Sequence, residues 1–293
     1  MAFAKRSIKI PPWIVLVYLL LGVGAVIMLM PFAWMLSASV KLDKELFSIP
    51  IRWIPAQLDL ANYPEAWERI NMGRLFLNTI FVCTVDVASQ IVLGAMAGYA
   101  FARLKFPGKQ VIFSALLITM MVPETVLLLP MFLFVRYFPL AGGNNLLGRG
   151  GVGLLNSYGG LMFPGLISVY GVFMFRQFFQ SFPIEVEDAS RIDGCSRNRF
   201  FWSVLVPNAQ PVMGTMGLFS FLWYWNAFVW PLVIIKEDSM KTIQLGISSF
   251  SQQFGTEWAL MMAASVTATL PILLVFLVLQ RFLVQGIATT GLK

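Results

Sequence analysis

The side chains best able to do chemistry are concentrated between residues 181 and 208, which read SFPIEVEDASRIDGCSRNRFFWSVLVPN. The chain on both sides of this segment is almost wholly apolar. Residues 185–199 hold seven charged residues around a glycine, Gly194: Glu185, Glu187, Asp188, Arg191, Asp193, Arg197 and Arg199. One interpretation is a solvated loop that only supplies positive charge to one side of a membrane. The other is a folded polar element with a task of its own.

Motifs for catalysis on this chain are missing from the sequence. There is no G-x-x-x-x-G-K-[ST] phosphate loop; the stretch KFPGKQ has Arg103 where the first glycine would stand, and no Ser or Thr after Lys109. Neither H-E-x-x-H nor G-x-S-x-G occurs. Histidine is absent and the two cysteines, Cys83 and Cys195, lie far apart in the sequence. We therefore expect no catalytic residue, no metal, no cofactor and no disulfide on this chain.

The composition indicates a membrane protein. Hydrophobic residues make up 58% of the 293 residues and charged residues 12%, against about 25% charged in soluble domains. The net charge of +7 does not indicate nucleic-acid binding, because no basic stripe interleaved with aromatic residues occurs. Basic residues instead lie in short segments beside apolar ones, where they attract lipid headgroups and set orientation.

Six segments are long and apolar enough to cross a bilayer as helices, which takes about 20 residues each. They cover residues 13–36, 76–100, 110–135, 158–180, 209–232 and 259–283. We expect an all-α integral membrane protein with a single transmembrane domain over residues 1–293. The first apolar stretch exceeds the roughly 7–15 residues of a cleavable signal, so we expect it to remain as a helix.

An even number of spans places both termini on one side of the membrane. Basic residues are denser in the segments that share a side with the N-terminus, and the positive-inside rule then makes that side cytoplasmic. The segment 181–208 would lie in the cytoplasm, between the fourth and fifth spans.

Local chemistry predicts a helix–turn–helix in this segment. Pro183 suits the first turn of a helix, where no N–H is needed, and acids follow at the positive end of the helix dipole. Gly194 permits the left-handed conformation that ends a helix. Ser196 is a suitable cap for the next helix, and Pro207 and Pro211 turn the chain back towards the membrane.

The same segment resembles the cytoplasmic signature loop of ABC-importer permease subunits. The matching residues are Asp188-Ala189-Ser190, Asp193-Gly194 and Pro207. Asp188 and Ser190 depart from the usual Glu and Ala, and Glu187 could partly replace the longer acidic side chain. The stretches PFAWMLSASVK, FLNTI, FLWYWNAFVWPL and MMAASVTATLPILLVFLVLQRFLVQGIATTGLK also resemble the maltose-type carbohydrate permeases, in the same order along the chain.

This resemblance implies a function and a set of partners. The loop would be a coupling helix docked in a groove of a cytoplasmic ATPase, through Glu187, Asp188, Ala189, Ser190, Asp193, Gly194 and Pro207. The chain would form half of a sugar pathway with a second, different permease chain. Two ATPase subunits, which bind ATP and Mg²⁺, and an external or periplasmic solute-binding protein would complete the importer in a bacterial or archaeal cytoplasmic membrane.

Two groups of residues are candidates for the substrate path. Asp86 and Glu124 lie at membrane depth, where ionisable side chains are costly and often functional; the alternative is a structural hydrogen bond. Trp223, Tyr224, Trp225 and Asn226 combine aromatic faces that stack on sugars with an amide that bonds to hydroxyls; the alternative is an interfacial aromatic belt.

A secondary transporter or channel subunit is the rival interpretation. Proton-coupled carriers use relays of carboxylates or histidines, and many contain inverted repeats. This chain has two isolated carboxylates within its spans, no histidine and no evident repeat. The residues therefore favour the importer permease.

Overall fold

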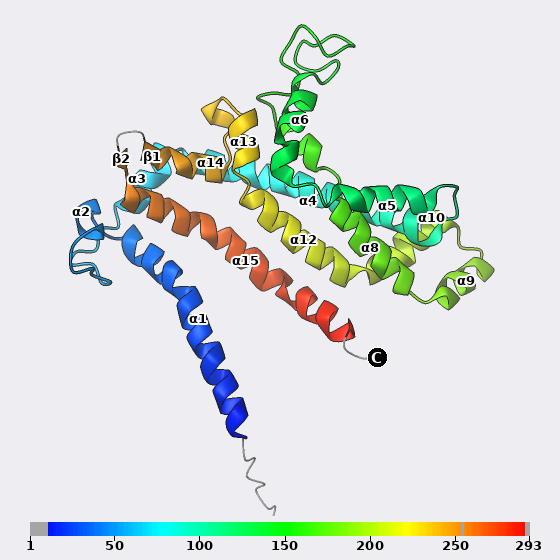
Figure 1. Ribbon diagram of the computed structural model, residues 1–293, viewed down its shortest axis with the longest axis horizontal. Coiled ribbons are helices and arrows are strands. Elements are labelled where there is room, and N and C mark those ends of the chain that lie inside the picture. The colour runs from blue at the N-terminus through cyan, green and yellow to red at the C-terminus, as the bar shows by residue number, and fades with distance from the viewer. Residues whose placement is uncertain (1–10, 253–254, 291–293) are drawn as a thin grey trace, which may run out of the picture. The chain divides into compact units, whose positions relative to one another are not determined.

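The computed structural model describes residues 11–252 and 255–290, and nearly all of its secondary structure is helical (Figure 1). The helices are α1 (Pro12–Ser39), α2 (Asp43–Leu46), α3 (Asn62–Arg69), α4 (Met72–Arg103), α5 (Lys109–Thr119), α6 (Glu124–Arg136), α7 (Tyr158–Met162), η1 (Phe163–Gly165), α8 (Val169–Ser181), α9 (Ile184–Ile192), α10 (Arg197–Phe200), the π-helix η2 (Phe201–Leu205), α11 (Val206–Asn208), α12 (Gln210–Trp225), α13 (Val229–Ile234), η3 (Asp238–Met240), α14 (Ile243–Ile247), η4 (Ser248–Phe250) and α15 (Trp258–Thr290). Two short strands, β1 (Ser251–Gln252) and β2 (Gly255–Thr256), pair antiparallel before α15. The predicted all-α class is confirmed.

The long helices expose apolar side chains along much of their length. On α1, Leu19, Val26 and Met28 are 61%, 70% and 77% exposed. On α15, Leu274 and Leu277 are each 64% exposed. Surfaces of this kind are stable in lipid and not in water, because apolar area exposed to water is unfavourable.

The chain divides into two compact units, of which the first comprises residues 11–69 and 250–267. Its small core contains Ala38, Leu46 and Ala259. The carboxylate of Asp43 accepts a hydrogen bond from the N–H of Ala259 (2.8 Å), in the first turn of α15. Arg69, at the end of α3, forms an ion pair with Glu257 at 2.6 Å.

Lys41 in the same unit is buried although it carries a charge. Its side chain is 0% exposed, and Nζ donates to the carbonyl of Arg52 (2.5 Å) and lies 4.5 Å from the ring centre of Trp34. Burial lowers the pKa of Lys41, and the nearby Glu45 carboxylate opposes that effect.

The second unit comprises residues 70–249 and 268–290, and α4 is its central helix. Helices α8 and α12 both pack against α4. The contact with α8 depends on Gly98, because a Cβ at that position would lie 2.6 Å from Cβ of Phe175. A buried aromatic core fills this part of the unit and includes Tyr99, Phe175, Phe179 and Phe201.

Among the residues that the structure describes, three continuous helices are able to span a membrane by length and composition, at Trp13–Ser39, Met72–Arg103 and Trp258–Leu283. Two of the other predicted spans are bent pairs. Helices α5 and α6 meet at 105°, and the pair Tyr158–Gly165 and Val169–Ser181 is bent by 40°. Pro123, directly before α6, lacks an N–H and so explains why the first pair breaks there.

The predicted span at 209–232 is not one helix. It is divided into α12 and α13 by residues 226–228, and α12, with 16 residues, is shorter than the roughly 17–25 residues of a spanning helix. The total of six spans therefore remains a prediction. The termini, for which we predict the cytoplasmic side, lie at residues 1–10 and 291–293, outside the described residues.

Candidate functional site

Residues 181–208, named here the coupling segment after their predicted role, form the expected helix–turn–helix. Pro183 directly precedes α9, one residue before the position predicted for it. Gly194 has φ of +76° and its N–H bonds to the carbonyl of Arg191 (3.0 Å), while the N–H of Cys195 bonds to the carbonyl of Ser190 (2.9 Å). This is the Schellman pattern, in which a left-handed glycine closes a helix. Ser196 then caps α10 by accepting from the N–H of Arg199 (3.3 Å).

One acidic side chain of the segment, Glu187, points inward and is 4% exposed. Its Oε1 lies 2.6 Å from the guanidinium of Arg191, and its Oε2 lies 3.7 Å from Nε of Arg103, at the end of α4. Arg103 also donates to the carbonyls of Phe179 (3.0 Å) and Phe182. A single guanidinium thus links α4, the end of α8 and α9.

The other predicted coupling residues of α9 lie on the accessible face. Asp188 and Ala189 are exposed, as are Asp193 and Gly194 in the following turn. Ser190 is half-buried, with its hydroxyl donating to the carbonyl of Glu187 (2.7 Å). The apolar side chains of Ile184, Val186 and Ile192 are 53%, 40% and 87% exposed beside these polar groups. The face therefore combines acids with uncovered apolar area.

The far end of the segment is fixed in the core of the second unit. The buried side chains there are Phe200, Phe201 and Leu205. The ring of Phe201 lies 5.2 Å from that of Tyr99 on α4 and 6.4 Å from that of Phe179 on α8. Pro207 follows the π-helix η2, whose wider turn is the kind of local irregularity found at breaks in helical hydrogen bonding.

Sequence reasoning missed Arg103 as part of this site. Arg103 was visible as an arginine at the end of a predicted span. Its partner Glu187 is distant in the sequence, so the ion pair depends on the tertiary fold.

The two membrane carboxylates occupy different surroundings. Asp86 on α4 is 0% exposed, and neither carboxylate oxygen has a hydrogen-bond partner among the described residues. Glu124 is exposed at the first position of α6. Both carboxylates act electrostatically on Tyr224.

The predicted aromatic group is divided between surface and core. Trp223 is 61% exposed, and Asn226 is exposed with its amide donating to the carbonyl of Leu222 (2.8 Å). Trp225 is 1% exposed and donates through Nε1 to the carbonyl of Ala268 (3.0 Å). The indole of Trp225 therefore packs in the interior of this chain and presents no exposed face to a ligand.

A polar network missed by sequence reasoning surrounds Tyr224. The amide nitrogen of Gln90 lies 2.7 Å from both the hydroxyl of Tyr224 and the carbonyl of Gly165, and the hydroxyl of Ser220 donates to Oε1 of Gln90 (2.7 Å). The network joins α4 and α12 to the bend between α7 and α8. Gln90 and Ser220 were recognisable only as isolated polar residues within apolar spans.

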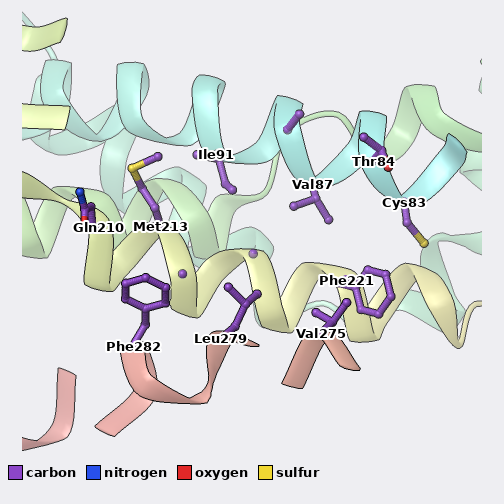
Figure 2. A pocket seen from close by; sticks show the side chains of 13 residues that line it. Cys83, Thr84, Val87, Ile91, Gln210, Met213, Phe221, Val275, Leu279 and Phe282 are labelled. Atoms are coloured by element: carbon purple, nitrogen blue, oxygen red, sulfur yellow. The ribbon is translucent and has the colours of Figure 1, made fainter. Parts of the chain in front are cut away.

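An apolar cavity of about 550 Å³ lies between α4, α12 and the part of α15 in the second unit. Figure 2 shows Val87 and Ile91 of α4 facing Leu279 and Phe282 of α15, with Met213 of α12 between them. None of the predicted path residues lines this cavity. Its lining suits apolar groups better than a hydroxyl-rich ligand.

Comparisons with known proteins agree with this architecture. Residues 90–289 match the family model described as the binding-protein-dependent transport system inner membrane component. A solved bacterial ABC transporter involved in the import of the acidic polysaccharide alginate has a similar fold, with a TM-score of 0.78 at 20% identity, covering 96% of this chain and 99% of that one.

Curated relatives match over nearly the whole chain. The diacetylchitobiose uptake system permease protein NgcG of Streptomyces coelicolor is 31% identical, over 89% of this chain and 83% of the relative. The lactose transport system permease protein LacG of Rhizobium radiobacter is 28% identical, over 92% and 93%. The sn-glycerol-3-phosphate transport system permease protein UgpE of Yersinia pestis is 27% identical, over 92% and 94%. The match decides between an importer permease and a secondary transporter in favour of the permease: the chain belongs to the family of inner membrane components of binding-protein-dependent transport systems.

Proposed function

We propose that this permease carries a sugar or oligosaccharide and couples its movement to a separate cytoplasmic ATPase through the coupling segment. It forms half of the pathway with a second, different permease chain. Two ATPase subunits and an external solute-binding protein complete the importer, in a bacterial or archaeal inner membrane with both termini of the chain cytoplasmic. The sugar class is supported by the names of the relatives, which include lactose, arabinooligosaccharide and diacetylchitobiose systems.

One observation carries the coupling proposal: the segment has an accessible face and a buried anchor. Asp188, Ala189, Asp193 and Gly194 are exposed, so they are available to a partner. Glu187 and the residues that follow α10 are held by α4 and α8. A passive linker has no need of both.

The route of transmission follows from these contacts. When the ATPase subunits close, they displace α9, which is short and rigid. Glu187 carries the displacement to Arg103 on α4, and Phe201 carries it to Tyr99 and Phe179. Close-packed interiors transmit such shifts because they are not easily compressed. Helices α4 and α8 would then move together, and the pathway would change from inward-facing to outward-facing.

Trp223, Asn226 and Glu124 are the members of the predicted path group with exposed side chains, and we assign them to the substrate path. An aromatic face, an amide and a carboxylate together offer stacking and hydrogen bonds to a hydroxylated ligand. Asp86 is buried and Tyr224 is half-buried, with its hydroxyl 2.7 Å from the amide nitrogen of Gln90. Trp225 supports the path from the core.

The chain itself hydrolyses no ATP in this proposal, because the nucleotide and Mg²⁺ belong to the partner ATPase. The test is uptake of labelled lactose and of short oligosaccharides into vesicles that contain the reconstituted complex. We expect uptake only when the ATPase, ATP inside the vesicle and the binding protein outside are all present. Uptake by the permease pair alone, driven by an ion gradient, would contradict the proposal.

A further inference from the structure

A second cavity, of about 360 Å³, lies where the turn between α4 and α5 meets the coupling segment. Its volume falls within the range of small-molecule sites, roughly 300–1,000 Å³. Six residues line it: Arg103, Leu104, Lys105, Phe106, Arg191 and Arg197. Four of the six are cationic and none is acidic. This basic cavity is therefore suited to an anion.

The charges around the basic cavity are only partly balanced by the chain. Arg103 and Arg191 form ion pairs with Glu187, and Arg191 also lies 3.6 Å from Asp188. Lys105 and Arg197 form no ion pair with any residue in the described part of the chain. Two like charges beside one cavity repel each other, and an anion bound between them would relieve that repulsion.

The position of the basic cavity indicates which anion. Residues 104–108 join α4 to α5, and α5 exposes the apolar side chains of Val111 (73%) and Ile118 (61%). Because α4 is long and apolar enough to span a membrane, we expect the turn at its end to lie at the depth of lipid headgroups. Leu104 and Phe106 add apolar surface to the lining, which a lipid's glycerol and first methylenes would cover. Free phosphate would use only the cations.

We propose that the basic cavity binds the phosphate of an anionic phospholipid. Arginine and lysine both bind phosphate, arginine through two parallel N–H groups and lysine as a point charge, and basic pockets of this kind are known lipid headgroup sites. The bound lipid would tie Lys105, in the turn before α5, to Arg197, at the start of α10. The lipid site shares Arg191 with α9, but its test changes only Lys105 and Arg197, so it does not depend on the coupling proposal.

The experiment measures the lipid that the complete complex retains. The complex is placed in bilayers of equal phosphatidylglycerol and phosphatidylcholine and extracted in mild detergent, and its lipids are counted by mass spectrometry. We expect wild type to retain phosphatidylglycerol at least fivefold over phosphatidylcholine. The double variant Lys105→Gln/Arg197→Gln should lose at least threefold of that preference, whereas the charge-keeping Lys105→Arg/Arg197→Lys should retain it. The control Arg149→Gln/Lys236→Gln removes the same charge from exposed positions elsewhere and should behave as wild type.

Three results would overturn the proposal. The first is equal retention of the two lipids by wild type, or equal preference in the glutamine variant and wild type. The second is displacement of phosphatidylglycerol by millimolar inorganic phosphate, which would make free phosphate the ligand. The third is loss of the ATPase from the glutamine variant in pure phosphatidylcholine, which would assign the cavity to an acidic group of the partner. Because Lys105 and Arg197 are exposed, both double variants should fold, and equal yield of the complex checks this.

Discussion

The guanidinium of Arg103 lies 3.7 Å from the carboxylate of Glu187, and the two side chains are only 10% and 5% exposed. Arg103 ends α4 and Glu187 lies in the middle of α9. Without Glu187, the buried guanidinium of Arg103 would lose its ion-pair partner, whereas Glu187 without Arg103 would keep its ion pair with Arg191. The pair therefore gives α9 a fixed attachment to the central helix of its unit.

Breaking this pair should uncouple the segment without preventing membrane insertion. Removing one partner of a buried pair costs about 3–5 kcal/mol, so Arg103→Gln and Glu187→Gln should each reduce sugar uptake at least tenfold. The double variant should be less damaged than the sum of the two predicts, because it leaves neither a buried guanidinium nor a buried carboxylate without a partner, and Arg191 is 52% exposed. Uptake and thermal unfolding of all four proteins form the double-mutant cycle. Strictly additive effects would show that the two residues act independently.

Gly194 should be required because its backbone adopts a positive φ, and not because a larger side chain would collide with neighbouring atoms. Its φ is +76°, and a Cβ added there would meet no atom within 4 Å. Valine in this region is a conformational outlier costing on the order of 1–2 kcal/mol, so Gly194→Val should lower uptake while the complex still reaches the membrane. Gly194→Asn is the matched control, because asparagine tolerates the left-handed region. Equal loss in both variants would mean that the side chain itself disturbs docking.

Alanine substitutions of Trp223 and Trp225 should have different effects, although the two residues are only two positions apart. Trp223→Ala removes an exposed ring and should lower sugar uptake at normal abundance. Trp225→Ala empties a core position, which costs about 3–5 kcal/mol, and should lower abundance and melting temperature first. Quantitative immunoblotting beside uptake separates the two effects. Normal uptake by Trp223→Ala would contradict its assignment to the substrate path and favour the alternative, an interfacial aromatic belt.

How far the sequence predicts this molecule depends on whether the determining interactions are local. The turn at Gly194 and the cap at Ser196 follow from residues beside them, and the structure confirms both. Pro123 indicates a break between α5 and α6, but the 105° angle between the two helices could not be predicted. An apolar composition indicates that a segment is long enough to span a membrane and does not indicate the direction in which its helices run. The pairing of Arg103 with Glu187 and the burial of Trp225 depend on which helices pack together, and neither could be predicted from local sequence.

The predicted orientation has a direct chemical test. Leu147 is 77% exposed in the loop after α6, and Asn198 is exposed in α10. In a background with Cys195→Ser, Leu147→Cys should react with an impermeant maleimide in intact cells. Asn198→Cys should react only after permeabilisation, because the coupling segment is assigned to the cytoplasm. Labelling of Asn198→Cys from outside would place the segment on the wrong side for an ATPase.

The coupling claim is tested most directly by reversing one exposed charge on α9. The side chain of Asp188 is 58% exposed, so Asp188→Lys should leave folding and membrane abundance near normal while placing the wrong charge at the docking face. Glu68→Lys makes the same change at an exposed position of α3 and serves as control. The measurement is ATPase co-purification together with sugar transported per ATP hydrolysed in reconstituted vesicles. We predict that Asp188→Lys loses ATPase retention or the transport ratio at least tenfold, and that Glu68→Lys loses neither. Normal retention and a normal ratio in Asp188→Lys would mean that the segment is only a linker.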